Sequence, residues 1–202
     1  MNELATQFGP IDIYLFDQLL RGRLSPPMRV IDAGCGSGRN LHYLMAVGFD
    51  VRAVDASPEA VATTRALAAR LAPALPSSNF RAEPVEAMSF ADDEADVVMS
   101  VAVLHFARDE AHFEGMLRSM WRVLRPGGLL FCRLASDIGM ESRMVPTSTG
   151  RYRLPDGSER YLVNEAVLLG WTQQLGGHLL DPLKTTVVQD QRCMTTWVVR
   201  KG

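Results

Sequence analysis

The sequence is poor in cysteine and has no long apolar run, and each shortage excludes a class of protein. Cys35, Cys132 and Cys193 are widely spaced, with no CxxC pair and no Cys/His cluster, so neither a disulfide framework nor a metal site is expected. No apolar stretch approaches the roughly 20 residues that span a bilayer. The first ten residues, MNELATQFGP, are polar and acidic and do not resemble a signal peptide. We therefore expect a cytoplasmic protein that does not act in a membrane.

The sequence also lacks a large excess of positive or of negative charge. Twenty-one basic residues stand against 23 acidic ones, which gives a formal charge of −2, and only Lys184 and Lys201 are lysines. This near-balance argues against a nucleic-acid groove or a polybasic membrane patch. The 202 residues are 47% hydrophobic and 22% charged, as in ordinary globular proteins, and no linker-like stretch divides them. We expect one domain over residues 1–202.

Short apolar runs alternate with amphipathic helical stretches over the first two thirds of the chain. A serine, Ser57, followed by Pro58 and Glu59 predicts the start of a helix that ends before Pro73. Strands alternating with helices indicate right-handed βαβ units and a parallel sheet covered on both faces, an α/β doubly wound fold. The predicted strands are 28–33, 50–55, 79–82, 95–100 and 129–134, and the predicted helices follow residue 40 and cover 60–72 and 110–124.

The last third has a different pattern. Residues 136–150 lack clear periodicity, and 151–163 are typical of a hairpin that turns at Pro155-Asp156-Gly157. A helix over 164–175 is expected next. Two closing strands, 179–188 and 192–200, lie close enough in sequence to pair antiparallel.

A glycine-rich loop follows the first predicted strand, in the stretch VIDAGCGSGRN over residues 30–40. Glycines there let the backbone turn tightly and approach a ligand. A dinucleotide fingerprint has glycine or alanine where Arg39 stands, Asp32 would repel a pyrophosphate, and GK[ST] is absent. The loop is thus better suited to an adenosyl ligand that has no phosphates and carries positive charge.

Asp55 supports this interpretation, because it ends the second predicted strand, where an acid can accept hydrogen bonds from both hydroxyls of a ribose. Asp32 can then face an ammonium or sulfonium group, at least indirectly. The alternative is that both acids only cap strand ends or bind loop amides.

Four motifs in this order resemble those of class I S-adenosylmethionine-dependent methyltransferases: VIDAGCGSGRN, VRAVDASPEAV, ADVVMSVAVLHF and WRVLRPGGLLF. The resemblance covers roughly residues 10–134, and the loop and compact size are similar to the type 11 and tellurite-resistance methyltransferase group. It implies a Rossmann-like sheet of seven strands, mostly parallel, with the last strand antiparallel.

The resemblance also implies S-adenosylmethionine as cofactor and assigns residues to it. Gly34, Gly36 and Gly38, with Asn40 in the same loop, would approach the methionine part, while Asp55 would hold the ribose. The adenine would lie near Ala56 and Ser57. The acid that the family often has after the third strand falls here on Pro84, so the backbone of Val85 or the side chain of Glu86 is expected instead. The residues expected to border the methyl group are Ser100, Val101 and Ala102.

Methyl transfer from a sulfonium is an in-line displacement, for which alignment and water exclusion supply much of the catalysis. A base is required only if the acceptor must lose a proton. His105, after the fourth predicted strand, is the candidate base. The alternative is that His105 orders its loop or bonds the cofactor. His42, His112 and His178 are expected to be structural or surface residues.

The acceptor site is expected under the N-terminal helix and a lid-like insertion at 136–163. Tyr14, Arg143 and Tyr152 are candidate substrate residues, although packing explains the tyrosines equally well. Without a basic face or an appended recognition domain, a small molecule is the expected methyl acceptor and nucleic acid is not.

The chain is expected to be a monomer or a homodimer. A cofactor-binding sensor or inactive partner subunit is the alternative function, and an NAD-dependent oxidoreductase is less favoured because of Arg39 and Asp32.

Overall fold

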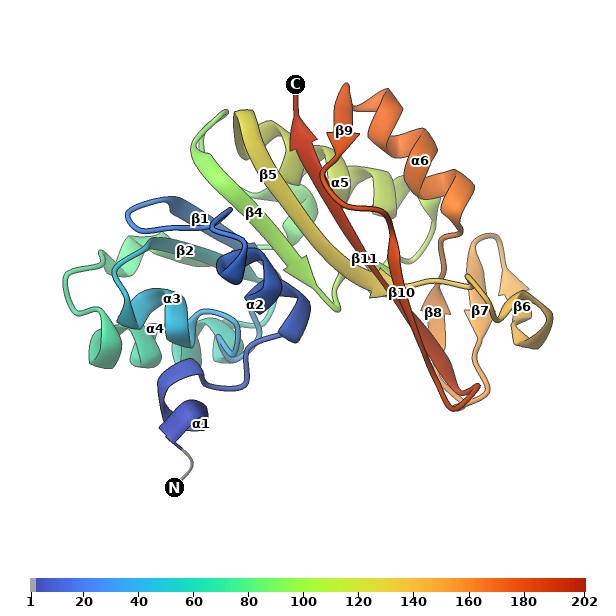
Figure 1. Cartoon of the computed structure of the whole chain (residues 1–202), viewed down its shortest axis with the longest axis horizontal. Coiled ribbons are helices and arrows are strands. Elements are labelled where there is room, and N and C mark those ends of the chain that lie inside the picture. Colours follow the sequence, from blue (N-terminus) through green and yellow to red (C-terminus); the bar gives the residue numbers. More distant parts are fainter. Residues whose placement is uncertain (1–2) are drawn as a thin grey trace.

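A mixed sheet of eight strands forms the centre of the molecule, with helices against both of its faces (Figure 1). The computed structural model describes residues 3–202. Seven strands follow one path in the order β10-β11-β5-β4-β1-β2-β3, and β9 pairs with β11 beyond the end of β10. The α/β doubly wound class predicted from the alternating pattern is confirmed.

The strands of the main sheet are β1 (Arg29–Ala33), β2 (Asp50–Asp55), β3 (Phe80–Ala82), β4 (Ala95–Val101), β5 (Leu124–Ala135), β9 (Gly177–Leu179), β10 (Lys184–Val188) and β11 (Arg192–Lys201). The helices are α1 (Glu3–Phe8), α2 (Ile13–Leu20), α3 (His42–Ala46), α4 (Pro58–Leu71), α5 (Glu110–Val123) and α6 (Glu165–Gln174), with short 3₁₀ turns η1 (Ser77–Asn79), η2 (Val85–Ala87), η3 (Leu104–Phe106) and η4 (Glu141–Arg143).

Strand direction reverses at β11, which is antiparallel to both of its neighbours, β10 and β5. β3, β2, β1, β4 and β5 run parallel, and β11 is antiparallel to β5 over seven residue pairs, from Met194↔Ala135 to Arg200↔Leu129. The expected antiparallel last strand is therefore confirmed. The chain leaves β1 toward β2 on one side and leaves β4 toward β5 on the other. The segments that follow these two neighbouring strands therefore diverge, and a crevice forms at the carboxyl ends of the strands.

Two strands differ from their predictions. The single strand predicted over 179–188 is wrong, because β9 and β10 are separated at 180–183: Pro182 has no N–H to donate to the ladder, and the Asp181 side chain turns to Arg23 at 2.7 Å. β5 begins at Leu124, ahead of the predicted 129, and absorbs the Arg125–Gly128 stretch as a register shift opposite Ala95 and Val97.

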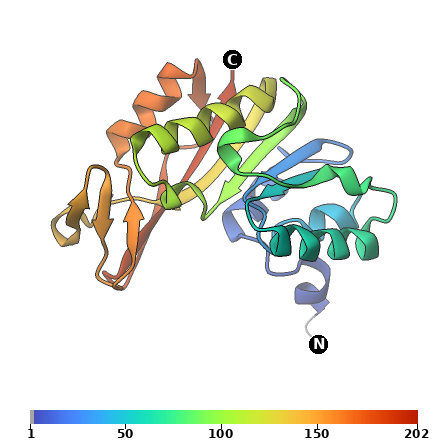
Figure 2. The ribbon, with the colours of Figure 1, turned by 180° about the vertical axis from the view of Figure 1, so that it is seen from behind.

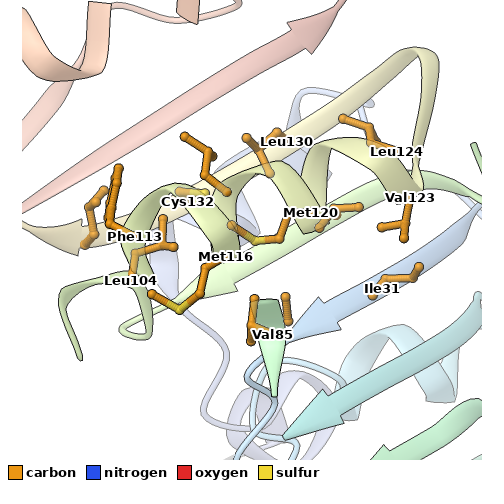
Figure 3. Close-up of a cluster of buried hydrophobic side chains, with 14 of the residues drawn as sticks. Ile31, Val85, Leu104, Phe113, Met116, Met120, Val123, Leu124, Leu130 and Cys132 are labelled. Atoms are coloured by element: carbon orange, nitrogen blue, oxygen red, sulfur yellow. The ribbon is translucent and has the colours of Figure 1, made fainter. Parts of the chain in front are cut away.

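The alternation of side chains along the strands builds two cores, one on each face. Ile31 of β1 faces the core formed with α5 and α6, while its neighbour Val30 faces the core under α2, α3 and α4. Figure 3 shows Phe113, Met116, Met120 and Val123 of α5 directed at the sheet. The helical spacing of Phe113, Met116 and Met120 predicts α5 from the sequence.

The segment 136–163 continues from β5 and lies beside the tip of the β10–β11 hairpin, as both views of the ribbon show (Figures 1 and 2). It contains a three-stranded antiparallel sheet, β6 (Val145–Ser148), β7 (Arg151–Arg153) and β8 (Glu159–Tyr161). The predicted hairpin is β7–β8, whereas β6 was not predicted because its four residues are all exposed and have no apolar alternation. Among residues 3–202, no helix is both long enough and apolar enough to cross a membrane.

Candidate functional site

A cavity of about 600 Å³ lies at the carboxyl ends of β1, β2 and β4. This is the edge of the sheet at which an open α/β fold binds its ligand. The wall is formed by Gly34, Cys35, Gly36, Ser37, Arg39, Asn40, Asp55, Ala56, Pro84, Val85, Glu86, Val101, Ala102, Val103, Phe106, Arg108, His112 and Met116. Nine of the expected cofactor residues are in this wall: Gly34, Gly36, Asn40, Asp55, Ala56, Val85, Glu86, Val101 and Ala102.

The glycine-rich loop needs its first glycine for space as well as for conformation. Gly34 has φ +93°, and a Cβ atom there would lie 2.4 Å from Cγ2 of Val103. The loop is anchored on β2, because the amides of Gly34 and Cys35 both donate to the carbonyl of Val54 at 2.9 Å. The loop backbone thus approaches the cavity with no side chain in between.

Asp55 holds this loop while it lines the cavity. Its Oδ2 accepts from the Gly36 amide and its Oδ1 from the Ser57 amide, each at 2.9 Å. The binding of loop amides, one of the two roles considered from the sequence, is therefore present. Each carboxylate oxygen can accept a further hydrogen bond, so a ribose can be bound by the same group.

Asp32 is buried next to the loop without a donor. Neither carboxylate oxygen has a hydrogen-bond partner among the described residues, and only 1% of the residue is exposed. Burial, opposed by Arg39 and aided by Asp55, raises the pKa of Asp32 to about 7. An orphaned buried acid is expensive for the protein, and it favours a ligand with positive charge nearby.

The far side of the cavity includes a histidine that was expected to be structural or on the surface. His112 Nε2 lies 3.0 Å from Oε1 of Glu86, and its Nδ1 accepts from the amide of Arg108 at 3.1 Å. Burial works to raise the pKa of Glu86, but its own backbone amide and His112 lower it overall. The N-cap Asp109, which starts α5 at this sheet edge, was the available sequence signal for His112.

The remaining expected cofactor residues lie behind the wall. Gly38 is packed against Thr64 and Leu67 of α4, and Ser57 caps α4 by accepting from the amide of Ala60. Ser100 donates from Oγ to the Ala33 carbonyl at 3.1 Å and so links β4 to β1. With Asp32, these residues support the loop from behind.

His105 lies deeper, in η3, and lines a second cavity of about 260 Å³. The amide of Ala135 donates to its Nδ1 at 3.2 Å. Burial, aided by Arg160, lowers the pKa of His105 to about 4. A neutral imidazole whose Nδ1 accepts a hydrogen bond carries its proton on Nε2.

The two cavities meet at Ala102, which contributes to both walls. Ala102 has φ +63°, an unfavourable conformation for a residue with a Cβ, and its amide donates to the Arg133 carbonyl at 2.8 Å. The hydrogen bond to the Arg133 carbonyl therefore holds the strained backbone of Ala102 at the point where the two cavities join.

The three candidate substrate residues lie outside both walls. The Tyr14 hydroxyl is 2.6 Å from Oγ1 of Thr186, and Arg143 pairs with Asp190 at 3.1 Å in an exposed position. Tyr152 packs against a small apolar cluster within and beside the 136–163 segment. Among residues 3–202 there is no group of three or more His, Cys, Asp or Glu side chains that could hold a metal ion.

Comparison with known proteins adds to this geometry. A family model described as a methyltransferase domain matches residues 31–132. The chain is 32% identical over 104 residues to a ubiquinone biosynthesis O-methyltransferase from Methylocella silvestris, covering 52% of this chain and 38% of that protein. It spans less than half the length of the curated relatives that it matches.

Two solved structures share the fold. A methyltransferase from Methanosarcina mazei has a TM-score of 0.70 at 20% identity, covering 91% of this chain and 96% of that chain. A Burkholderia thailandensis 1,6-didemethyltoxoflavin-N1-methyltransferase, solved with bound 1,6-didemethyltoxoflavin and S-adenosylhomocysteine, has a TM-score of 0.69 at 19% identity, covering 98% of this chain and 80% of that chain.

Proposed function

Because the chain belongs to the methyltransferase domain family, we propose that it transfers a methyl group from S-adenosylmethionine to a small-molecule acceptor. The observation that carries the proposal is the pairing of two acids at one loop. Asp55 lines the large cavity with lone pairs to spare, and Asp32 is buried behind it without any donor among the described residues. Together they suit a ligand that has ribose hydroxyls and a positive charge.

The residues of the large cavity divide between the parts of such a cofactor. The loop at Gly34 and Gly36 accommodates the methionine part, and Arg39 supplies a cation for its carboxylate. Asp55 accepts from the ribose hydroxyls. Val85 and Glu86 border the adenine, with His112 fixing the Glu86 carboxylate.

The cofactor supplies an activated methyl carbon, and the protein supplies alignment and a dry site. Ala102 stands at the junction of the two cavities, so an acceptor in the smaller cavity approaches the larger one past its backbone. Holding both reactants in line converts the transfer into an effectively unimolecular step. We assign the 136–163 segment as the lid that excludes water, within one domain over residues 1–202. The monomeric or homodimeric state and the cytoplasmic location remain predictions from the sequence.

Calorimetry with S-adenosylhomocysteine tests the cofactor site. The wild-type protein is expected to bind it, and Asp55→Ala is expected to weaken binding at least about 100-fold, because the ribose contacts and the loop anchor are lost together. Glu59→Ala, which removes an exposed acid in the first turn of α4, four residues after Asp55, is expected to leave the affinity unchanged. Equal affinities of wild type and Asp55→Ala would contradict the site.

A second measurement separates an enzyme from a sensor or inactive subunit. The protein is incubated with S-adenosylmethionine labelled in its methyl group and a small-molecule extract, and transferred label is counted. Transfer that Asp55→Ala abolishes supports the enzyme. Tight cofactor binding without transfer to any acceptor pool favours the sensor, and tight binding of NADH in place of S-adenosylhomocysteine favours the oxidoreductase.

A further inference from the structure

The smaller cavity has a chemistry of its own. It lies between the carboxyl ends of β4 and β5, the tip of the β7–β8 hairpin and the β10–β11 hairpin. It adjoins the larger cavity at Ala102, so if the larger one holds the methyl donor, the smaller one is the acceptor side. What lines it therefore bears on the acceptor.

Hydrogen-bond donors dominate this wall. His105 has its Nδ1 engaged by the Ala135 amide, which leaves Nε2 as an N–H donor and removes the ring as a base. Nε2 has no hydrogen-bond partner among residues 3–202. The imidazole thus offers the cavity a hydrogen-bond donor, Nε2–H, and no hydrogen-bond acceptor.

Arginines supply the other donors. Arg160 lies over the Phe106 ring at 4.9 Å, which keeps its guanidinium beside His105 and Phe106. Arg192, at the start of β11, is exposed. Arg133 pairs with Asp12 at 3.2 Å, and its buried Nε has no partner within the described part of the chain. Each of these groups donates only.

Acidic groups do not balance these donors. Asp156 is the one carboxylate in the described wall, and both the amide and the hydroxyl of Ser158 already donate to its Oδ1. Because Asp12 pairs with Arg133, the two remaining arginines of the wall, Arg160 and Arg192, have one carboxylate to balance them, that of Asp156. The wall therefore has surplus positive charge and surplus donors, together with apolar surface from Leu154, Ala135 and Met194.

We propose that the smaller cavity binds a carboxylate group through His105 Nε2–H, Arg160 and Arg192, so that the methyl acceptor is a small carboxylic acid. This rests on the proposed function, since it takes the smaller cavity as the acceptor side. The apolar wall fits the hydrocarbon part of the acid. The carboxylate need not be the methylated atom, because it orients the molecule wherever the accepting atom lies.

Benzoate and benzamide provide matched probes, since they share one ring and differ in charge. In a first titration the protein is saturated with S-adenosylhomocysteine, which measures its affinity for that ligand. The saturated protein is then titrated with each probe at low salt. Benzoate is expected to bind at least about tenfold more tightly than benzamide, as charge-assisted hydrogen bonds predict. In Arg160→Gln combined with Arg192→Gln this preference falls to about twofold or less, while the affinity for S-adenosylhomocysteine stays unchanged.

Arg153→Gln serves as the control. Arg153 is an exposed arginine on the β7–β8 hairpin, which also carries Arg160, but the Arg153 side chain lies outside both cavity walls. The control variant is expected to retain the full preference for benzoate. Equal binding of the two probes, no binding of benzoate, or a preference that survives in the double variant would overturn the proposal. Failure of the first titration, with S-adenosylhomocysteine, would instead overturn the proposed function, so the two failures are distinguishable.

Discussion

The backbone amide of Ala135 donates a hydrogen bond to Nδ1 of His105 at 3.2 Å. The bond ties η3 to the end of β5 and determines which ring nitrogen carries the proton. Because Nδ1 is engaged as an acceptor and the ring is buried, His105 is a neutral hydrogen-bond donor at its other nitrogen. Of the two roles considered for this histidine, the geometry favours the ordering one.

His105 is expected to remain neutral from pH 8 down to about pH 5, because its pKa is lowered to about 4. Nitrogen chemical shifts of ¹⁵N-histidine-labelled protein should show an unprotonated Nδ1 and a protonated Nε2 throughout this range. His178, which is exposed, provides an internal comparison. A titration of His105 near pH 6.5 would contradict the assignment.

The same pKa makes the fold acid-sensitive. The unfolded chain takes up a proton at His105 as the pH falls through about 6.5, whereas the folded chain does so only near 4. Stability contributed by this group is therefore present above pH 6.5 and is lost as the pH falls toward 4, by up to about 3 kcal/mol. Urea unfolding at pH 7 and pH 4.5 should show a smaller loss for His105→Asn than for the wild type.

Asp32→Asn is expected to stabilise the ligand-free protein at pH 8. The folded pKa of Asp32 is raised to about 7, so the folded state holds a proton that the unfolded chain releases near pH 4. Stability is thus lost as the pH rises from 4 to 7, by a few kcal/mol and at most about 4. The variant removes this loss, so thermal unfolding should show a clearly larger gain in stability at pH 8 than at pH 5.

The affinity of Asp32→Asn for S-adenosylmethionine should fall about tenfold at pH 8, since a negative charge near a sulfonium and an ammonium is removed. Calorimetry with S-adenosylmethionine measures it. Unchanged affinity together with raised stability would show that Asp32 has no part in cofactor binding.

Gly34→Ala and Gly48→Ala separate backbone strain from steric clash. The two glycines have φ +93° and +92°, but a Cβ at Gly48 meets nothing within 4 Å, whereas at Gly34 it would strike Val103 at 2.4 Å. Both variants should lose about 1–2 kcal/mol from the left-handed conformation. Gly34→Ala should lose about 2 kcal/mol more and most of its cofactor affinity. Equal losses in urea unfolding would contradict the contact with Val103.

Asp181→Ala is expected to destabilise the fold by about 3 kcal/mol, because it leaves Arg23 and Gln18 without their buried acceptor. Asp190→Ala is the matched control, since its pair with Arg143 is exposed and should be worth less than about 1 kcal/mol. Burial works to raise the pKa of Asp181, but Arg23 and Gln18 lower it overall. The difference between the variants should therefore shrink as the pH falls from about 4, where the unfolded acid takes up its proton, through the lower pKa of the folded acid.

The sequence by itself determined the class of fold and the order of its elements, because these depend on local pattern. Ser57 predicts the start of α4 through its side-chain cap, and the apolar spacing from Phe113 to Met120 predicts α5. The glycine loop and Asp55 carry their signal within short stretches of chain, so this half of the large cavity could be found from residues 30–57 alone.

The tertiary structure decided everything that depends on residues distant in the chain. Between β9 and β10 the Asp181 side chain reaches Arg23, 158 residues away, and although Pro182 marks a break locally, no local pattern identifies Arg23 as the partner. His112 reaches the cavity wall only because α5 begins at the same sheet edge as the glycine loop.

The smaller cavity is the strongest case. Arg133, Arg160 and Arg192 come from three separate elements, and the protonation of His105 depends on the amide of Ala135 across the sheet edge. A sequence determines which groups a protein has, whereas the packing of strands from both halves of the chain decides which of them face one another and which proton each one holds.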